Sequence, residues 1–209
     1  ANTGEDDIIA AKDINYAANI ESAETYRVGL SFSEQCALED VLTEELPTCD
    51  EVAKLLNIPV YQTLKTLVYT AEFHKKDGSI KYAHYILLLL GDDSLNEVKL
   101  TNHIKGAAKL YTSTEETLKE FGLPKGYMSP LNKTGLNVII DNAIDENASY
   151  VVGANKVNYH TKGFSVARDL ESYKKVDLRL AKIGDVGPDR KTPIEFKKGI
   201  EVGQVFQLG

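Results

Sequence analysis

The chain has 209 residues, of which 43% are hydrophobic and 26% are charged, and its net charge is −7. These proportions are typical of a globular protein with one sizeable core. The longest apolar run, residues 86–90, is far too short to span a bilayer, and no secretory signal pattern opens the chain. We therefore expect no membrane partner and a cytoplasmic location.

Cysteine and histidine residues do not indicate a metal site. The two cysteines, Cys36 and Cys49, give neither a metal-ligand spacing nor a disulfide framework, and the four histidines lie far apart in the sequence. We expect no structural zinc and no other metal ligand. A reducing compartment is the default for such a chain.

Acidic side chains are concentrated in the first 50 residues, which hold 12 acidic and 2 basic residues, against 19 and 22 in the remainder. No run of Lys or Arg is longer than two, whereas proteins that grip nucleic acid alone usually carry a clear basic face. We expect weak intrinsic RNA binding. We predict an acidic flank over residues 1–46, a core domain over residues 47–180 and a return linker over residues 181–209.

Helix starts are indicated by three capping boxes, in which a Ser or Thr precedes Glu by three residues. These motifs begin at Thr48, Ser94 and Ser113. The predicted helices end near Pro59, Gly106 and Gly122, because Pro and Gly interrupt or cap a helix.

Strand signals dominate the middle of the chain. Residues 63–72 and 82–90 are rich in β-formers and flank Asp77-Gly78, which predicts a hairpin. The unbroken apolar run within residues 82–90 indicates a strand buried on both faces. Further strands are predicted at residues 107–111, 137–140, 149–152 and 175–180, with loops at 122–135 and 153–163. The fold class is therefore α/β or α+β, with a mixed, mostly antiparallel sheet and packed helices.

The sequence shows no local motif of a known catalytic mechanism. The sequence holds no Gly-rich phosphate loop, no nucleophile elbow and no convincing nucleophile–base spacing. Any function must therefore be argued from larger patterns.

Both ends of the chain carry extended motifs of one family. The first end reads Thr3-Gly4-Glu5-Asp6 followed by Tyr16-Ala17-Ala18-Asn19-Ile20-Glu21, and the other, residues 199–209, reads Gly-Ile-Glu-Val-Gly-Gln-Val-Phe-Gln-Leu-Gly. They resemble the segments that border the large inserted domain of bacterial-type prolyl-tRNA synthetase. The resemblance implies that the intervening chain is the editing domain of that enzyme.

Internal motifs of that family follow in the same order. The strand motif Thr63-Leu64-Lys65-Thr66-Leu67 is similar to the one that holds the lysine required for editing, and this implies that Lys65 meets the phosphate or terminal adenosine of the tRNA. The stretch from Gly126 to Pro130 resembles the Gly-x-x-x-Pro loop that cradles the aminoacyl group, and here it includes Ser129. Taken alone, the first motif is also compatible with a surface lysine at the end of a strand, and the second with a plain turn.

A third motif, Gly153-Ala154-Asn155 followed by His160 and Arg168-Asp169, resembles the family's Gly-Ala-Asn…His…Arg-Asp pattern. It implies that Gly153 and Asn155 bind substrate and that His160 faces it, whereas a lone histidine is more often structural. The family's tryptophan before Arg-Asp is replaced here by Val166 and Ala167.

Two further positions show differences from the family. Asp93 stands where a histidine is expected and Leu90 where an arginine is expected, in the Gly91-Asp92 block, to which we assign no catalysis.

Cys49 and Val52 fall where the family places the aliphatic walls of its amino-acid pocket, or equally serve as core. Both are smaller than the Ile and Leu expected there, so the edited amino acid stays open.

The resemblance implies post-transfer editing. The domain would hydrolyse the ester of mischarged Ala-tRNA(Pro), with water oriented by the substrate's ribose hydroxyl and without an enzyme nucleophile. Lys65 and His160 would be the catalytic residues. The partners implied are the acceptor end of tRNA(Pro) and the catalytic and anticodon-binding domains of the synthetase. Editing would need no cofactor, because ATP and Mg²⁺ serve only the synthetase core.

Three alternatives remain from the sequence. The chain could act on Cys-tRNA(Pro), it could be an inactive insertion that supports the synthetase fold or tRNA docking, or it could be a generic ligand-binding module.

Overall fold

The computed structural model describes residues 7–199, and the parts of the two terminal motifs at residues 3–6 and 200–209 lie outside this range. In chain order the elements are β1 (Asp7–Ala11), β2 (Tyr16–Asn19), β3 (Glu39–Leu42), α1 (Cys49–Leu56), β4 (Leu64–His74), β5 (Ile80–Leu90), α2 (Glu97–His103), β6 (Lys109–Thr112), α3 (Glu115–Glu120), β7 (Asn137–Asp141), β8 (Tyr150–Gly153), β9 (Tyr159–Phe164), α4 (Val166–Asp169), β10 (Lys174–Val176) and β11 (Glu195–Lys198). Within residues 7–199, no helix has the length and apolar character that crossing a membrane requires.

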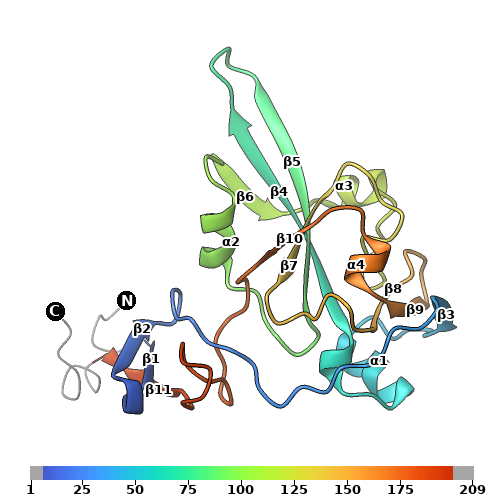
Figure 1. Cartoon of the computed structure of the whole chain (residues 1–209). Helices are drawn as coiled ribbons and strands as arrows, with labels where there is room; N and C mark the ends of the chain where they lie inside the picture. Colours follow the sequence, from blue (N-terminus) through green and yellow to red (C-terminus); the bar gives the residue numbers. More distant parts are fainter. Residues whose placement is uncertain (1–6, 200–209) are drawn as a thin grey trace.

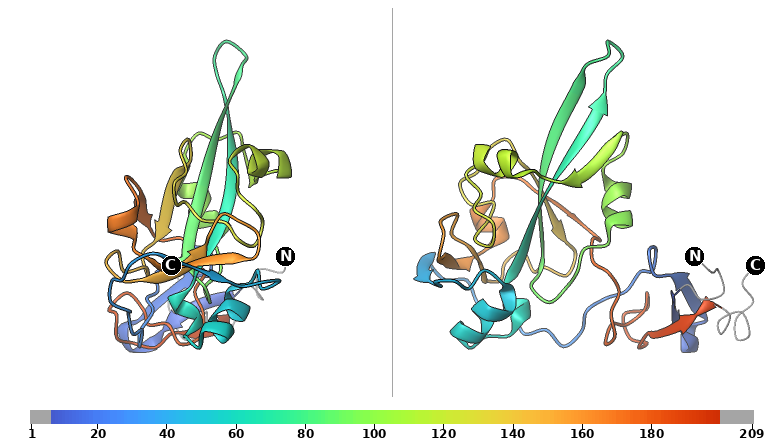
Figure 2. Two further views of the ribbon diagram at one scale, coloured as in Figure 1. Left: turned by 90° about the vertical axis from the view of Figure 1, so that its right-hand side faces the viewer. Right: turned by 180° about the vertical axis from the view of Figure 1, so that it is seen from behind.

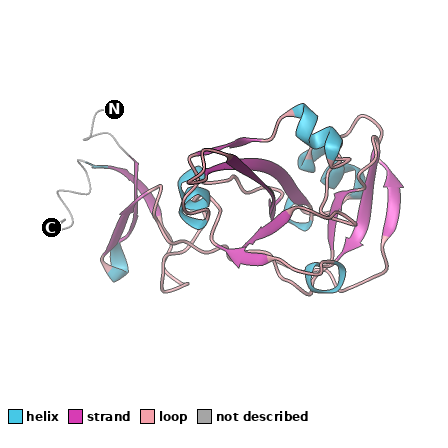
Figure 3. Ribbon diagram, turned by 90° about the horizontal axis from the view of Figure 1, so that it is seen from above, coloured by secondary structure: helices cyan, strands magenta, loops and turns pink. Residues whose placement is uncertain are grey.

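Three sheets organise the described chain (Figures 1 and 3). The largest has the strand order β10-β7-β5-β4-β6, and two smaller ones have the orders β3-β9-β8 and β11-β1-β2. Pairing is parallel for β5–β7 and β7–β10 and antiparallel for the other paired strands. The prediction of an α+β fold with a mixed, mostly antiparallel sheet is confirmed.

The predicted hairpin forms the centre of the large sheet. Strands β4 and β5 pair over eleven residues, from Leu64 opposite Leu90 to His74 opposite Ile80. At the turn, Gly78 has a φ of +88°, which glycine adopts without steric cost. The far end of this hairpin extends beyond the rest of the molecule, whereas its base, where β4 begins, lies within the body (Figure 2).

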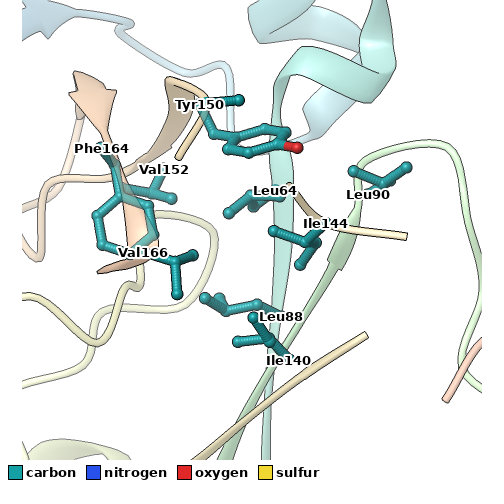
Figure 4. Packing of buried hydrophobic residues seen from close by; sticks show 10 residues of the cluster. Leu64, Leu88, Leu90, Ile140, Ile144, Tyr150, Val152, Phe164 and Val166 are labelled. Atoms are coloured by element: carbon teal, nitrogen blue, oxygen red, sulfur yellow. The ribbon is translucent and has the colours of Figure 1, made fainter. Parts of the chain in front are cut away.

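Alternation along β5 divides the core between the two faces of the large sheet. Leu87 and Leu89 pack with Leu100 of α2 on one face, and Leu88 packs with Val166 of α4 on the other. All five residues of the run 86–90 are fully buried, as predicted for a central strand. Figure 4 shows the second cluster, in which side chains from β8 and β9 close over the sheet.

Helix starts follow the predicted motifs with a shift at two of them. Thr48 caps α1, since its Oγ1 accepts from the Glu51 N–H at 3.2 Å. At the second motif the cap is Asn96 and not Ser94, because Asn96 Oδ1 accepts from Val98 N–H and Lys99 N–H. At the third motif Thr114 replaces Ser113 as the cap. A cap residue needs a side-chain oxygen that accepts from a free N–H group two or three residues later. Asn96 and Thr114 each supply such an oxygen.

Some strands lie where none was predicted. The loop predicted at residues 153–163 includes all but the last residue of β9, a strand that pairs with β8 and with β3. Near the chain ends, β1, β2 and β11 form their own sheet, which Figure 1 shows apart from the large one. The pairings β3–β9 and β1–β11 join segments far apart in sequence, which local patterns do not reveal. The three-part domain division stays a prediction.

Replacing Leu88 tests the packing of this core. Leu88→Ala removes a fully buried side chain from the central strand and should lower the free energy of unfolding by about 2–5 kcal/mol. Leu55→Ala is the matched control, because Leu55 is 53% exposed and lies in a helix. Urea titration followed by circular dichroism measures both. Equal losses in the two variants would contradict the assigned core.

Candidate functional site

A cavity of about 210 Å³ lies where the base of β4 meets α1, β8, β9 and the loop before β7. Six of the residues singled out in the sequence line it: Cys49, Val52, Lys65, Gly126, Gly153 and His160. They come from segments up to 111 residues apart, between Cys49 and His160. The fold therefore brings together the larger part of the predicted site.

Lys65 is the second residue of β4, and it lines the cavity. Its ammonium Nζ donates to the backbone carbonyl of Asp93 at 2.5 Å. The side chain is partly buried, so the ammonium has lost part of its water shell and gains from this carbonyl in return. The arrangement places one cationic donor at the cavity while fixing it to a neighbouring loop.

His160 reaches the cavity from β9 and is 6% exposed. Its Nδ1 lies 2.5 Å from Oγ1 of Thr43, and its ring packs against that of Tyr127 at 5.2 Å between centroids. Burial lowers the pKa of His160 to about 4, so the imidazole is neutral at pH 7. A neutral ring held at one nitrogen can offer the other nitrogen as a donor or an acceptor.

Two glycines allow the backbone of the 126–131 loop to approach the cavity. A side chain at Gly153 would place its Cβ 2.1 Å from the carbonyl carbon of Tyr127, so only glycine permits this contact. Gly126 has a φ of +85° and a Cβ there would lie 2.5 Å from Pro47. The close approach leaves main-chain groups of this loop along the cavity, which is the usual means of polarising a carbonyl without a charged side chain.

Comparison with known proteins agrees with this geometry. The family model "Aminoacyl-tRNA editing domain" matches residues 43–169. The chain belongs to the aminoacyl-tRNA editing domain family.

Similarity to curated proteins extends over the whole chain. A proline–tRNA ligase of Lactococcus lactis subsp. cremoris (strain MG1363) is 39% identical over 208 residues, which are 99% of this chain and 32% of that protein. A proline–tRNA ligase of Janthinobacterium sp. (strain Marseille) is 37% identical over 211 residues, which are 100% of this chain and 36% of that protein. The chain thus spans about a third of the length of these relatives.

Solved structures share the fold, and one of them concerns editing. It is a protein proposed to be a trans-editing enzyme for prolyl-tRNA synthetase, with a TM-score of 0.56 and 21% sequence identity. The alignment covers 69% of this chain and 87% of that chain.

Three residues predicted to bind substrate hold the loop of this editing domain and do not line its cavity. Asn155 accepts from the Ser129 N–H at 2.8 Å and donates to the Leu131 carbonyl at 3.1 Å. Its own N–H donates to the Tyr127 carbonyl at 2.8 Å. Ser129 is fully buried, and Pro130 is buried beside it. Direct substrate contact by Ser129, Pro130 and Asn155 stays a prediction.

The Arg168-Asp169 motif has a clear structural task. The Arg168 guanidinium pairs with Asp169 at 2.8 Å and donates to the carbonyls of Cys36 at 2.7 Å and Gly163 at 2.6 Å. These contacts tie the chain before β3 to the end of β9. No tryptophan is needed for them.

Several cavity residues were not identified from the sequence. Thr63 and Thr66 line the cavity on either side of Lys65, and Oγ1 of Thr66 is buried without a hydrogen-bond partner among the described residues. Both could have been predicted, because Thr63 lies two residues and Thr66 one residue from Lys65. Thr43 was not predictable, because its contact with His160 spans 117 residues.

A larger hollow of about 650 Å³ lies elsewhere, between the segment 24–32 and β10. It contains none of the predicted site residues, so the smaller cavity is the better candidate. Within residues 7–199, no cluster of three or more His, Cys, Asp or Glu side chains is arranged to hold a metal ion. The expectation that editing needs no cofactor stays a prediction.

The low pKa of His160 predicts a pH-dependent stability. Between pH 6.5 and about 4 the unfolded chain binds a proton at this histidine and the folded chain does not, so folding stability falls as the pH falls. Wild type should lose up to about 1.4 kcal/mol per pH unit in this window relative to His160→Gln. Urea titrations of both proteins at pH 7, 5.5 and 4.5 measure the difference. Parallel pH curves would exclude a buried neutral imidazole.

Proposed function

We propose that this editing domain hydrolyses the ester bond of mischarged Ala-tRNA(Pro). The observation that carries the proposal is the convergence of Lys65, His160 and the Gly126 loop around one small cavity. Family membership and the similarity to proline–tRNA ligases support it. The partners would be the acceptor end of tRNA(Pro) and the remaining domains of the synthetase, and the location the cytoplasm.

The need for such a site follows from the size of the amino acids. The amino-acid pocket of a synthetase that accepts proline cannot exclude alanine sterically, and the missing methylenes give only about 1–3 kcal/mol of discrimination. A second site that hydrolyses the smaller product corrects the error. A cavity of about 210 Å³ is below the range of about 300–1,000 Å³ usual for drug-sized ligands, which suits a short aminoacyl group.

The apolar walls of the cavity support a small side chain as the substrate. Val52 is 1% exposed and Val151 is 6% exposed, and both line the cavity together with Met128. A methyl group would be buried against them. The proposal expects these walls to reject the proline ring, because tightly packed walls move only at a cost.

The reaction would proceed without an enzyme nucleophile. A water oxygen attacks the ester carbonyl carbon, the ribose oxygen leaves and takes up a proton, and the products are alanine and free tRNA. The neighbouring ribose hydroxyl of the substrate would orient the water. The main chain of the Gly126 loop would polarise the carbonyl, Lys65 would hold the nucleic-acid end, and His160 would face the terminal ribose or the water.

Weak RNA affinity of the isolated domain is compatible with this function. The parent enzyme would hold the tRNA and deliver its end at a high effective concentration. The editing site then needs to recognise only the terminal nucleotide and its amino acid.

Replacing Lys65 tests the proposal most simply. Lys65→Ala should abolish deacylation of Ala-tRNA(Pro), because no other group at this position would hold the nucleic-acid end. The unfolding midpoint should stay near that of wild type. Lys76→Ala is the matched control, since Lys76 is exposed on the β4–β5 turn. Release of labelled alanine from charged tRNA measures the rate, and unchanged hydrolysis would remove Lys65 from the mechanism.

The same assay with Ala-, Cys- and Pro-tRNA(Pro) separates the alternatives. Preference for Cys-tRNA(Pro) would assign the domain to cysteine clearance, which the small Cys49 and Val52 walls would also permit. Hydrolysis of none of the three would favour an inactive insertion.

Cys49 provides a test of the missing nucleophile. It lines the cavity, and burial raises the pKa of its thiol above the ordinary value, so the reactive thiolate is disfavoured. Cys49→Ser should therefore retain a deacylation rate within about tenfold of wild type, since removing a catalytic nucleophile lowers the rate by far more. Deacylation rates of the two proteins decide the point. A loss comparable to that of Lys65→Ala would indicate covalent catalysis.

A further inference from the structure

One short loop after β5, residues 91–94, lies between residues that line the cavity and the two segments that lead to the β11-β1-β2 sheet. On the cavity side Gly91 packs directly against two cavity residues, because a Cβ there would lie 2.0 Å from Oγ1 of Thr63 and 3.0 Å from Cβ of Cys49. The Gly91 N–H also donates to the Thr63 carbonyl at 2.9 Å. Movement of this loop would therefore change the cavity.

The carbonyl that holds the cavity lysine belongs to the same loop. Lys65 Nζ donates to the Asp93 carbonyl at 2.5 Å, as described above. The position of the ammonium consequently depends on where the main chain of Asp93 lies.

The carboxylate of Asp93 points to the opposite side and is fully buried. Three cations surround it: Arg27 at 3.1 Å, Arg179 at 3.1 Å and Lys182 at 3.2 Å. A buried carboxylate needs such pairing, because an uncompensated charge would be strongly destabilising. The contacts are ionic in geometry and lack directional hydrogen bonds to the carboxylate oxygens among the described residues.

These cations come from the two segments that lead to the β11-β1-β2 sheet. Arg27 follows β2, and its guanidinium also pairs with Asp92 at 2.8 Å and 3.0 Å. Arg179 and Lys182 follow β10, and Arg179 is bound in turn by Asp185 at 2.7 Å. These two segments, which we call the flank in this subsection, therefore hold the 91–94 loop from the side away from the cavity.

We propose that Asp93 is a positioning residue that couples the flank to the cavity, its carboxylate being held by Arg27, Arg179 and Lys182 while its carbonyl sets the place of the Lys65 ammonium. Its effect on hydrolysis rests on the proposed function, whereas its effect on Lys65 does not. The attachment of the flank thus determines whether the editing site is correctly formed.

The test measures the chemical reactivity of the Lys65 amine in the 209-residue chain. Brief acetylation with an N-hydroxysuccinimide ester, followed by peptide mass spectrometry, gives the labelling of Lys65 relative to the exposed Lys76. Arg27→Gln and Lys182→Gln each remove one cation from Asp93, and we expect the ratio to rise severalfold in both. Lys182 is 35% exposed, so its replacement is compatible with a folded chain. Arg27→Lys should restore the ratio toward wild type.

Arg190→Gln is the matched control. It removes a cation of the same flank that lies over the Tyr26 ring at 4.2 Å from the centroid, with no ion pair to Asp93 among the described contacts. The labelling ratio should stay at the wild-type value. A rise equal to that of Arg27→Gln would overturn the proposal, since it would indicate general loosening of the flank.

Deacylation rates separate this proposal from the proposed function. With Ala-tRNA(Pro), Arg27→Gln and Lys182→Gln should lower kcat/KM by about 10- to 100-fold, the size expected when a catalytic group is misplaced. Raised Lys65 labelling with a wild type that hydrolyses no ester would support the positioning role and refute the deacylase. An unchanged labelling ratio in folded Arg27→Gln and Lys182→Gln would overturn the positioning role, whatever the wild-type activity.

Discussion

The pairing of β4 with β5 is the constraint on which the rest of the molecule depends. Leu64 of β4 is buried with Leu88 and Leu90 of β5 in one apolar cluster, and a shift of β4 by one residue would bring the charged Lys65 into that cluster. A slip of one residue would move every side chain of β4 to the opposite face. The register that places Leu64 opposite Leu90 therefore also fixes Lys65 at the cavity. The position of the site is a consequence of core packing.

Around this fixed strand, the cavity is completed by main chain more than by reactive side chains. The missing Cβ at Gly153 admits the Tyr127 backbone, and the missing Cβ at Gly91 lets the loop that carries Asp93 pack against Thr63. Two ionisable groups at the cavity are uncharged at pH 7, since burial lowers the pKa of His160 to about 4 and raises the pKa of the Cys49 thiol. Such a site suits a reaction in which position and polarisation replace a nucleophile.

Local signals in the sequence were sufficient for the central elements. The Thr48 cap, the turn at Gly78 and the apolar run of β5 each act over a few residues, and all three are found in the structure. Lys65 and His160 were placed by resemblance to a family, and they do line one cavity. The pairing of β9 with β3 and the Thr43–His160 contact escaped prediction, because both join residues more than 100 positions apart. The choice of Asn96 as a cap also has a tertiary cause, since its amide donates to the Glu21 carbonyl at 3.1 Å.

Binding of an aminoacyl-adenosine analogue tests the central claim, that this cavity receives the end of a mischarged tRNA. In 3′-alanylamino-3′-deoxyadenosine an amide replaces the ester, so the analogue is not hydrolysed. Titration followed by NMR should shift the ring signals of His160 and the ammonium signals of Lys65, and the prolyl counterpart should leave both unmoved. Shifts confined to residues outside the cavity, or equal shifts with the two analogues, would contradict the account.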